Sequence, residues 1–356
     1  MNKNRKRYTL QDSANAFLAI FLVQILFVIV FSMIVSAVSK NTGMTTDEIL
    51  NSNLCMFMNL IFSELIFFIV YVLYNVATQK KGFARASRMH VPKDWKLILG
   101  VIGLAAIALF GFNRFIGLFD YLLENVFGIA NNQSSLFIMD NFGMFLVGVL
   151  LLAGIPAIAE ELVFRGIIFN GLREKYSART AIILSAIMFT LMHMSIYKTA
   201  YQLVLGLMLG AIIYLTGSIF YSMIFHFVNN FLIVLINYIC TNTGSTFFVY
   251  TDWSTMNVIL AIGEAVLATV LLVVGVYLMS KYCKKKKDFD MDFKLERGDI
   301  ENSDEETNFV GGTDVTGLSD YEIKQLNSSF FISARGWLII SFVLSAIMWL
   351  ISSFGG

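Results

Sequence analysis

The sequence predicts an all-α protein, a polytopic transmembrane helical bundle with about eight core spans and a ninth at the C-terminus. Of its 356 residues, 57% are hydrophobic, and the mean hydropathy is +0.71. Only 14% are charged, whereas roughly a quarter of the residues in a typical soluble domain are charged. Several apolar runs approach the roughly 20 residues that a helix needs to cross a bilayer. This composition excludes an ordinary soluble domain and a disordered chain.

The apolar runs divide the chain into nine expected spans. They occupy residues 16–38, 54–76, 97–118, 143–169, 180–199, 201–216, 218–239, 257–279 and 337–353. The first run is too long for the core of a signal peptide and lacks a clear cleavage site, so we expect it to remain as an anchor. Gly206 and Gly210 have the spacing of a small-residue motif, which predicts a close helix–helix contact.

We expect five parts along the chain. They are N-terminal transmembrane spans one to three (1–142), catalytic core spans (143–240), an additional span (241–280), a polar cytoplasmic loop (281–335) and a C-terminal span (336–356). The loop carries the acidic run Asp304-Glu305-Glu306 and little apolar periodicity, which predicts disorder.

The basic residues predict the orientation of the bundle, because Lys and Arg concentrate in cytoplasmic loops. If the N-terminus is cytoplasmic and the nine spans alternate, all but four of the 26 basic residues lie in the cytoplasm. Lys40 and Lys198 fall on the other side, and Arg114 and Arg165 fall within spans. We therefore expect a multi-pass protein of the cell membrane with a cytoplasmic N-terminus.

The net charge and the cysteines exclude two further classes. A formal net charge of +1 gives no basic field for nucleic acid. The three cysteines show no Cys-x-x-Cys spacing, which argues against a disulfide framework and a thiolate metal site. The expected partners are the lipid bilayer and a peptide or membrane-protein substrate, with no nucleic acid.

Polar and ionisable side chains interrupt three of the expected spans. Such residues are costly inside a bilayer and mark candidate functional positions. The candidates are Glu160, Glu161, Arg165, His193, His226 and Asn230. A rise of about 1.5 Å per residue places the carboxyl and imidazole groups at similar depths near the middle of the bilayer. This shared depth predicts one site.

Helical spacing separates the two glutamates. Glu161 and Arg165 lie one turn apart and are expected to neutralise one another or to brace neighbouring helices. Glu160 points about 100° away from Glu161 and is left to face a cavity. Elsewhere, Glu64 and Glu264 are expected to make ordinary hydrogen bonds between helices.

These residues, in this order, resemble the CPBP family of intramembrane proteases (CAAX protease and bacteriocin-processing, also called Abi). The family pattern is Glu-Glu-xxx-Arg, then Phe-xxx-His, then His-xxx-Asn. The chain has Glu160-Glu161 followed by Arg165, then Phe189 to His193, then His226 to Asn230. Three ordered motifs on separate apolar spans make a specific signal.

The resemblance implies an intramembrane endopeptidase that hydrolyses a peptide or protein substrate. Glu160 and His193 would activate the attacking water, and His226 and Asn230 would donate hydrogen bonds to the oxyanion. Glu161 and Arg165 would support the site.

No metal cofactor is favoured, because no His-Glu-x-x-His pair places two ligands one turn apart. A zinc-dependent protease stays open as an alternative, with Glu160, His193 and His226 as ligands and water as the fourth. A further alternative is a non-catalytic membrane scaffold or bacteriocin-immunity protein with the same fold. A proton-coupled transporter is disfavoured, because the polar residues lie in one block of the chain.

Overall fold

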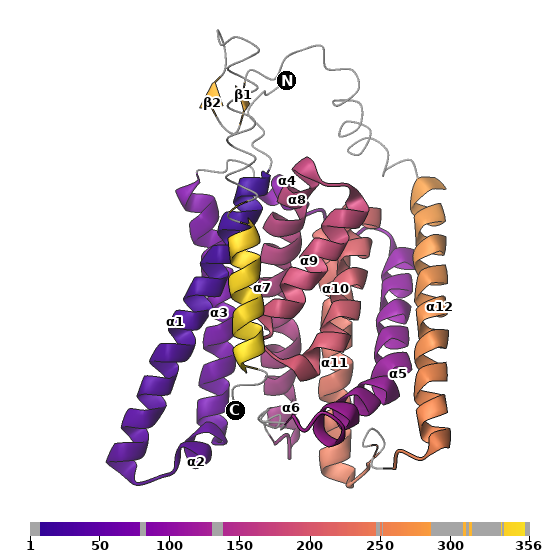
Figure 1. Cartoon of the computed structure of the whole chain (residues 1–356). Helices are drawn as coiled ribbons and strands as arrows, with labels where there is room; N and C mark the ends of the chain where they lie inside the picture. The colour runs from indigo at the N-terminus through magenta and orange to yellow at the C-terminus, as the bar shows by residue number, and fades with distance from the viewer. Residues whose placement is uncertain are drawn as a thin grey trace.

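The computed structural model describes residues 8–78, 83–129, 138–246, 250, 252–285, 309–310, 313–314, 336 and 338–352. Within these ranges the chain forms a helical bundle (Figure 1), which confirms the predicted all-α class. Seven helical runs of 21 to 34 residues are apolar and long enough to cross a membrane, and two shorter apolar helices accompany them. The chain is therefore a multi-pass membrane protein.

Six of the long runs are continuous α-helices, and the remaining one is subdivided. The continuous helices are α1 (Leu10–Thr42), α3 (Asn53–Ala77), α5 (Trp95–Asn125), α10 (Ile196–Thr216), α11 (Ile219–Thr243) and α12 (Thr255–Lys285). The run Phe142–Lys175 contains α6 (Phe142–Gly148), η1 (Val149–Gly154), α7 (Ile155–Val163), η2 (Phe164–Phe169) and α8 (Asn170–Lys175). The shorter apolar helices are α9 (Ala178–Met192) and a C-terminal helix (Leu338–Ser352). The minor elements are α2 (Thr46–Leu50), α4 (Phe83–Ala86), β1 (Phe309–Val310) and β2 (Thr313–Asp314), the last two paired antiparallel.

Local sequence signals set the helix ends. Thr9 caps α1 in a capping box with Asp12, and Ser218 caps α11 through the backbone N–H of Phe220. Side-chain oxygens at these positions satisfy N–H groups that have no partner inside the helix. Gly217 ends α10 with φ of +67°, a left-handed conformation that glycine adopts without a steric cost.

Contacts between connecting segments define one face of the bundle, which we call the N-terminal face and which Figure 1 draws at the top. Tyr8 donates to Asn75 Oδ1 at 2.7 Å, so the start of α1 lies beside the end of α3. The backbone N–H of Ile219 donates to Arg88 O at 3.1 Å, so the α10–α11 turn lies beside the segment after α4. With the shorter α9 included, the successive membrane helices from α1 to α12 therefore alternate in direction between this face and the opposite one.

Helix α9 is shorter than the predicted span 180–199. Its 15 residues reach about 22 Å at about 1.5 Å per residue, less than the roughly 30 Å hydrocarbon core. The prediction was wrong at this boundary because Ser195 caps a new helix and Met194 adopts a left-handed φ of 45°. The turn that contains His193 therefore lies within the membrane depth. The C-terminal helix reaches the same turn, where Ser352 Oγ donates to Met194 O at 2.6 Å.

The close contact predicted at Gly206 and Gly210 is confirmed and joins α10 to α9. A Cβ atom at Gly206 would lie 2.9 Å from Ala186 Cα, and one at Gly210 would lie 3.2 Å from Ile182 Cγ2. The absence of side chains lets the two helix backbones approach closely.

The predicted boundary at residue 280 falls inside α12, which continues to Lys285. The rest of the predicted polar loop to residue 335 lies outside the described residues, apart from the backbone of β1 and β2.

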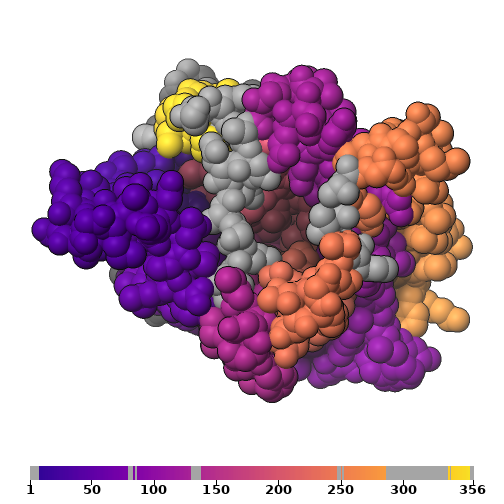
Figure 2. Space-filling view, turned by 90° about the horizontal axis from the view of Figure 1, so that it is seen from below, coloured from indigo at the N-terminus to yellow at the C-terminus, as the bar shows by residue number. Residues whose placement is uncertain are grey.

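The face opposite the N-terminal face is hollowed. Figure 2 shows this hollow from below, and its floor has the colour of the chain around residue 200. That position agrees with the early end of α9, because neither α9 nor the start of α10 fills the membrane depth below their turn.

Candidate active site

Two π-helical segments flank the part of the fourth span that carries the two glutamates. Segment η1 ends at Gly154, α7 carries Glu160 and Glu161, and η2 begins at Phe164. A π segment adds a residue to a helical turn and often occurs at functional sites. Here the segments set the rotation of α7 relative to the rest of its span.

Glu161 and Arg165 form the ion pair that their spacing predicts. Arg165 Nη1 donates to Glu161 Oε1 at 2.8 Å, and both side chains are 0% exposed. Arg165 Nη2 also donates to Gly206 O at 3.1 Å, and Ser222 Oγ donates to Glu161 Oε2 at 2.5 Å. The pair therefore joins the fourth span to α10 and α11.

Phe189 lies at the centre of the site. The guanidinium carbon of Arg165 lies 4.7 Å from the centroid of its ring, a cation–π distance. The rings of His193 and His226 meet the ring of Phe189 edge-on, with centroids at 4.9 and 6.0 Å. Phe189 therefore fixes both imidazoles relative to the ion pair.

His226 lies between the two glutamates. Its Nδ1 donates to Glu161 Oε1 at 3.3 Å, and its Nε2 lies 3.9 Å from Glu160 Oε2. The second distance is too long for a hydrogen bond. The ring is thus oriented by Glu161, with its second nitrogen toward Glu160.

The hydrogen bond that His193 makes defines its tautomer. Its Nδ1 lies 2.9 Å from Phe189 O, and a carbonyl oxygen only accepts, so Nδ1 carries hydrogen. In the neutral ring, Nε2 is then an acceptor. No direct hydrogen bond joins His193 to Glu160 within the described ranges.

Asn230 is bound to the backbone of the fourth span. Its Nδ2 donates to Leu152 O at 3.1 Å. Leu152 lies four residues before Pro156, whose nitrogen carries no hydrogen for that carbonyl. Asn229 Nδ2 donates to Asn230 Oδ1 at 3.2 Å, and Tyr201 donates to Asn229 Oδ1. This chain of hydrogen bonds fixes the amide of Asn230.

Glu160 is the carboxylate left without a hydrogen bond. The residue is 7% exposed, and its Oε2 has no hydrogen-bond partner in the described part of the chain. A buried acceptor without a partner is costly, and such costs persist at functional sites. Glu160 therefore differs from Glu161, which accepts hydrogen bonds from three side chains.

The structure gathers the predicted residues around α7, α9 and α11. Glu160, Glu161, Arg165 and His226 form one cluster, His193 joins it through Phe189, and Asn230 joins it through Leu152 O. Ser222, Asn229 and Tyr201 also contribute to the site and were not predicted from the sequence. Residues with hydroxyl or amide side chains are common in membrane helices, so their presence alone does not mark a functional position.

The conditional zinc ligands do not form a compact set. Over the residues that the structure describes, no group of three or more His, Cys, Asp or Glu side chains has metal-binding geometry. His226 Nδ1 is occupied by Glu161, and its Nε2 lies 3.9 Å from Glu160 Oε2.

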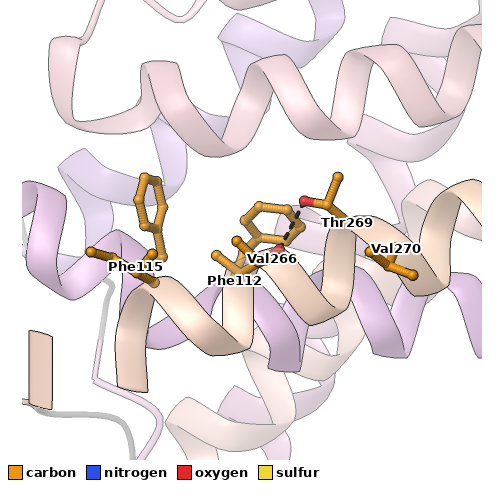
Figure 3. A pocket seen from close by; sticks show the side chains of 7 residues that line it. Phe112, Phe115, Val266, Thr269 and Val270 are labelled. Carbon is orange, nitrogen blue, oxygen red and sulfur yellow. Dashed lines mark hydrogen bonds between the residues drawn. The ribbon is translucent and has the colours of Figure 1, made fainter. Parts of the chain in front are cut away.

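A separate apolar groove lies between α5 and α12 (Figure 3). Its lining includes Phe112, Phe115, Val266 and Val270. Thr269 also lines it, and its hydroxyl donates a hydrogen bond to Ala265 O at 2.8 Å. It contains no ionisable residue, so it is not part of the candidate site.

The comparison with protein families finds a match for one segment of the chain. Residues 142–232 match the family model described as type II CAAX prenyl endopeptidase Rce1-like. This segment contains all three motifs, so the predicted resemblance to the CPBP family of CAAX proteases is confirmed for it. No curated protein and no solved structure matches the chain. The match supports an intramembrane endopeptidase of the CAAX type with a peptide or protein substrate.

Proposed function

We propose that this chain is a glutamate-type intramembrane endopeptidase that hydrolyses a peptide or membrane-protein substrate. The observation that carries the proposal is the buried Glu160 carboxylate, which has a free Oε2 beside His226. A carboxylate oxygen that accepts no hydrogen bond, while the neighbouring polar groups are hydrogen-bonded to one another, is suited to accept a proton from water. The hollow in the face opposite the N-terminal face supports access for water and substrate.

In this mechanism, Glu160 takes a proton from the attacking water, and the bare Nε2 of His193 accepts the second hydrogen bond of that water. The C–O bond forms as the carbonyl becomes an oxyanion. The C–N bond then breaks, and the protonated Glu160 returns the proton to the leaving nitrogen.

His226 and Asn230 are the proposed oxyanion donors. His226 Nε2 is the ring nitrogen not committed to Glu161, and it donates when it carries a proton. Asn230 Nδ2 donates one of its two hydrogens to Leu152 O, and the second is available for the oxyanion. Glu161 and Arg165 support the site by holding His226, α10 and α11 together.

The decisive experiment compares wild type with Glu160→Gln in reconstituted vesicles that contain a fluorescence-quenched peptide library. We expect cleavage to fall by at least about 100-fold, with an unchanged level of folded protein. The control is Glu264→Gln, which changes a glutamate paired with Arg114 at 3.2 Å and should leave cleavage unchanged. Wild-type cleavage by Glu160→Gln refutes the proposed base.

The same assay separates the alternatives. No cleavage by wild type, together with equal cellular phenotypes for wild type and Glu160→Gln, would indicate the non-catalytic scaffold or immunity protein. Loss of wild-type activity on metal stripping and recovery only with Zn²⁺ would indicate the zinc-dependent protease. Comparative peptidomics of cells that carry either form would identify the substrate.

We also propose that the N-terminus is cytoplasmic. Cys55 lies in the first turn of α3 and Cys240 in the last turn of α11, so both lie toward the face opposite the N-terminal face. Both are partly exposed, whereas Cys283 near the N-terminal face is buried. A membrane-impermeant thiol reagent added outside cells should label Cys55 and Cys240, and Cys→Ser variants provide the controls. Absence of labelling in cells, with labelling after lysis, would contradict this orientation.

A further inference from the structure

Helix α3 contributes a second buried carboxyl group. Glu64 is 9% exposed, and its Oε2 has no hydrogen-bond partner among the residues described. The expected hydrogen bond to another helix is therefore missing at this atom. By contrast, Glu264 accepts from Arg114 Nε at 3.2 Å. Glu64 requires another explanation.

Contacts of α3 with η2, one turn past the two glutamates, bring Glu64 toward Glu160 on α7. Phe67, one turn after Glu64, packs on Phe164, one turn after Glu160, with ring centroids 6.1 Å apart. Further along, Tyr71 Cε2 lies 3.5 Å from the position of a Cβ atom at Gly166. Both helices run toward the N-terminal face, so the pairing continues one turn back to the two glutamates.

The charges of the site do not balance if every carboxyl group ionises. Within α3, α7 and η2, the carboxyl groups of Glu64, Glu160 and Glu161 have one permanent cation, Arg165, which is committed to Glu161 at 2.8 Å. Full ionisation would leave a net charge of −2, or −1 if His226 were also protonated. Two neighbouring carboxylates in a low dielectric do not both ionise readily. One proton shared by Glu64 and Glu160 removes this excess.

We propose that Glu64 is a positioning residue that shares one proton with Glu160, an inference that rests on the proposed function of Glu160. The proton on Glu64 is donated in a hydrogen bond to Glu160 and holds its carboxylate toward the water. When Glu160 accepts the proton of the water, the pair carries two protons and no charge. When the leaving nitrogen takes one proton, the pair returns to one proton and a single negative charge.

Few other ionisable groups face Glu64 from the elements packed against α3. Helix α7 supplies Glu160 and Glu161, η2 supplies Arg165, and η1 has no ionisable residue. Helix α1 has only Asp12, which binds Tyr74 near the N-terminal face, and Lys40 at its other end. The short α2 carries Asp47 and Glu48 near the opposite face. Glu160 is therefore the carboxyl group available to share a proton with Glu64.

The test uses Glu64→Leu and Glu64→Gln in the reconstituted peptide-library assay. Leucine removes both the proton and the hydrogen bond, so we expect kcat to fall about 100-fold with KM unchanged within about twofold. The Tm should stay nearly unchanged, because a packed apolar side chain replaces a buried carboxyl group. Glutamine keeps a hydrogen-bond donor but does not ionise and so cannot share a proton, and we expect a loss of about tenfold. Its pH–rate profile should also lose one ionisation.

The control is Glu264→Leu, which leaves Arg114 without its carboxylate and should lower the Tm while kcat per folded molecule stays unchanged. A lower Tm with wild-type kcat for Glu64→Leu would show a structural role and overturn the inference. Wild-type kcat and pH profile in both Glu64 variants, with Glu160→Gln inactive, would overturn it while the proposed function stands. An active Glu160→Gln would instead refute the proposed function itself.

Discussion

The buried ion pair between Glu161 and Arg165 provides the sharpest test of the structure. We consider Arg165→Met, which keeps a long side chain and removes the charge. The variant loses the bond to Glu161 Oε1 at 2.8 Å, the bond to Gly206 O at 3.1 Å and the stacking on Phe189. Glu161 then remains buried, with the hydroxyl of Ser222 and the ring of His226 as its hydrogen-bond donors.

Coulomb's law sets the scale of the effect. Two unit charges at 2.8 Å attract by about 6 kcal/mol at an effective dielectric constant of about 20. Removing one partner of a buried pair costs about 3–5 kcal/mol, because the other charge stays in a low dielectric. We expect Arg165→Met to lower the free energy of unfolding by this amount. The double variant Glu161→Gln/Arg165→Met leaves no buried charge at these positions and should recover more than half of the loss.

The assay is reversible unfolding in mixed detergent micelles, followed by tryptophan fluorescence. The matched control is Arg114→Met, because its ion pair with Glu264 has partly exposed side chains, 21% and 39%, and should contribute about 1 kcal/mol or less. A loss below about 1 kcal/mol for Arg165→Met, or a double variant no more stable than the single one, would contradict the buried pair.

Three further predictions concern the contacts around the site. Gly206→Ala places a Cβ atom 2.9 Å from Ala186 Cα and should destabilise the fold by about 1–3 kcal/mol, whereas Gly263→Ala, with open space around it, should not; equal unfolding midpoints would contradict the α9–α10 contact. Asn230→Leu removes the donor to Leu152 O and should lower both stability and cleavage. Adding Pro156→Ala to this variant supplies a backbone N–H and should restore about 1 kcal/mol of stability without restoring cleavage. Recovered cleavage in the double variant would argue against an oxyanion role for Asn230. Tyr201→Phe leaves the buried Asn229 Oδ1 without its donor and should cost about 1–3 kcal/mol, measured by the same unfolding assay; an unchanged free energy would show that this hydrogen bond contributes nothing.

Much of the architecture follows from local sequence. Apolar run length predicts nine membrane helices, because each span must satisfy its own backbone hydrogen bonds in lipid. Seven helical runs are long enough to cross a membrane, and the other two predicted spans form shorter apolar helices. The spacing of Glu161 and Arg165 predicts their ion pair for a similar reason, since residues one turn apart on a helix are neighbours. These features depend on a few consecutive residues.

The missed features depend on packing between distant segments. The proposed pairing of Glu64 with Glu160 depends on the register between α3 and the fourth span, which includes the contact of Phe67 with Phe164. Nothing in the sequence around Glu64 sets that register. The hydrogen bond from Asn230 Nδ2 to Leu152 O likewise requires α11 to lie beside η1. Spacing alone identifies candidate residues but does not show which of their atoms are already bound.

Because α9 ends early, the backbone carbonyls at its end need hydrogen-bond donors from other helices, and this need explains the surrounding contacts. A helix that ends inside the membrane leaves backbone carbonyls without intrahelical partners, and lipid cannot satisfy them. Side chains of neighbouring helices do so here, since Gln24 of α1 donates to Met192 O at 3.3 Å and Ser352 donates to Met194 O at 2.6 Å. A full-length α9 would need neither donor, but its next turn would occupy the space below His193. The bundle therefore keeps that space at membrane depth by satisfying the turn from two other helices.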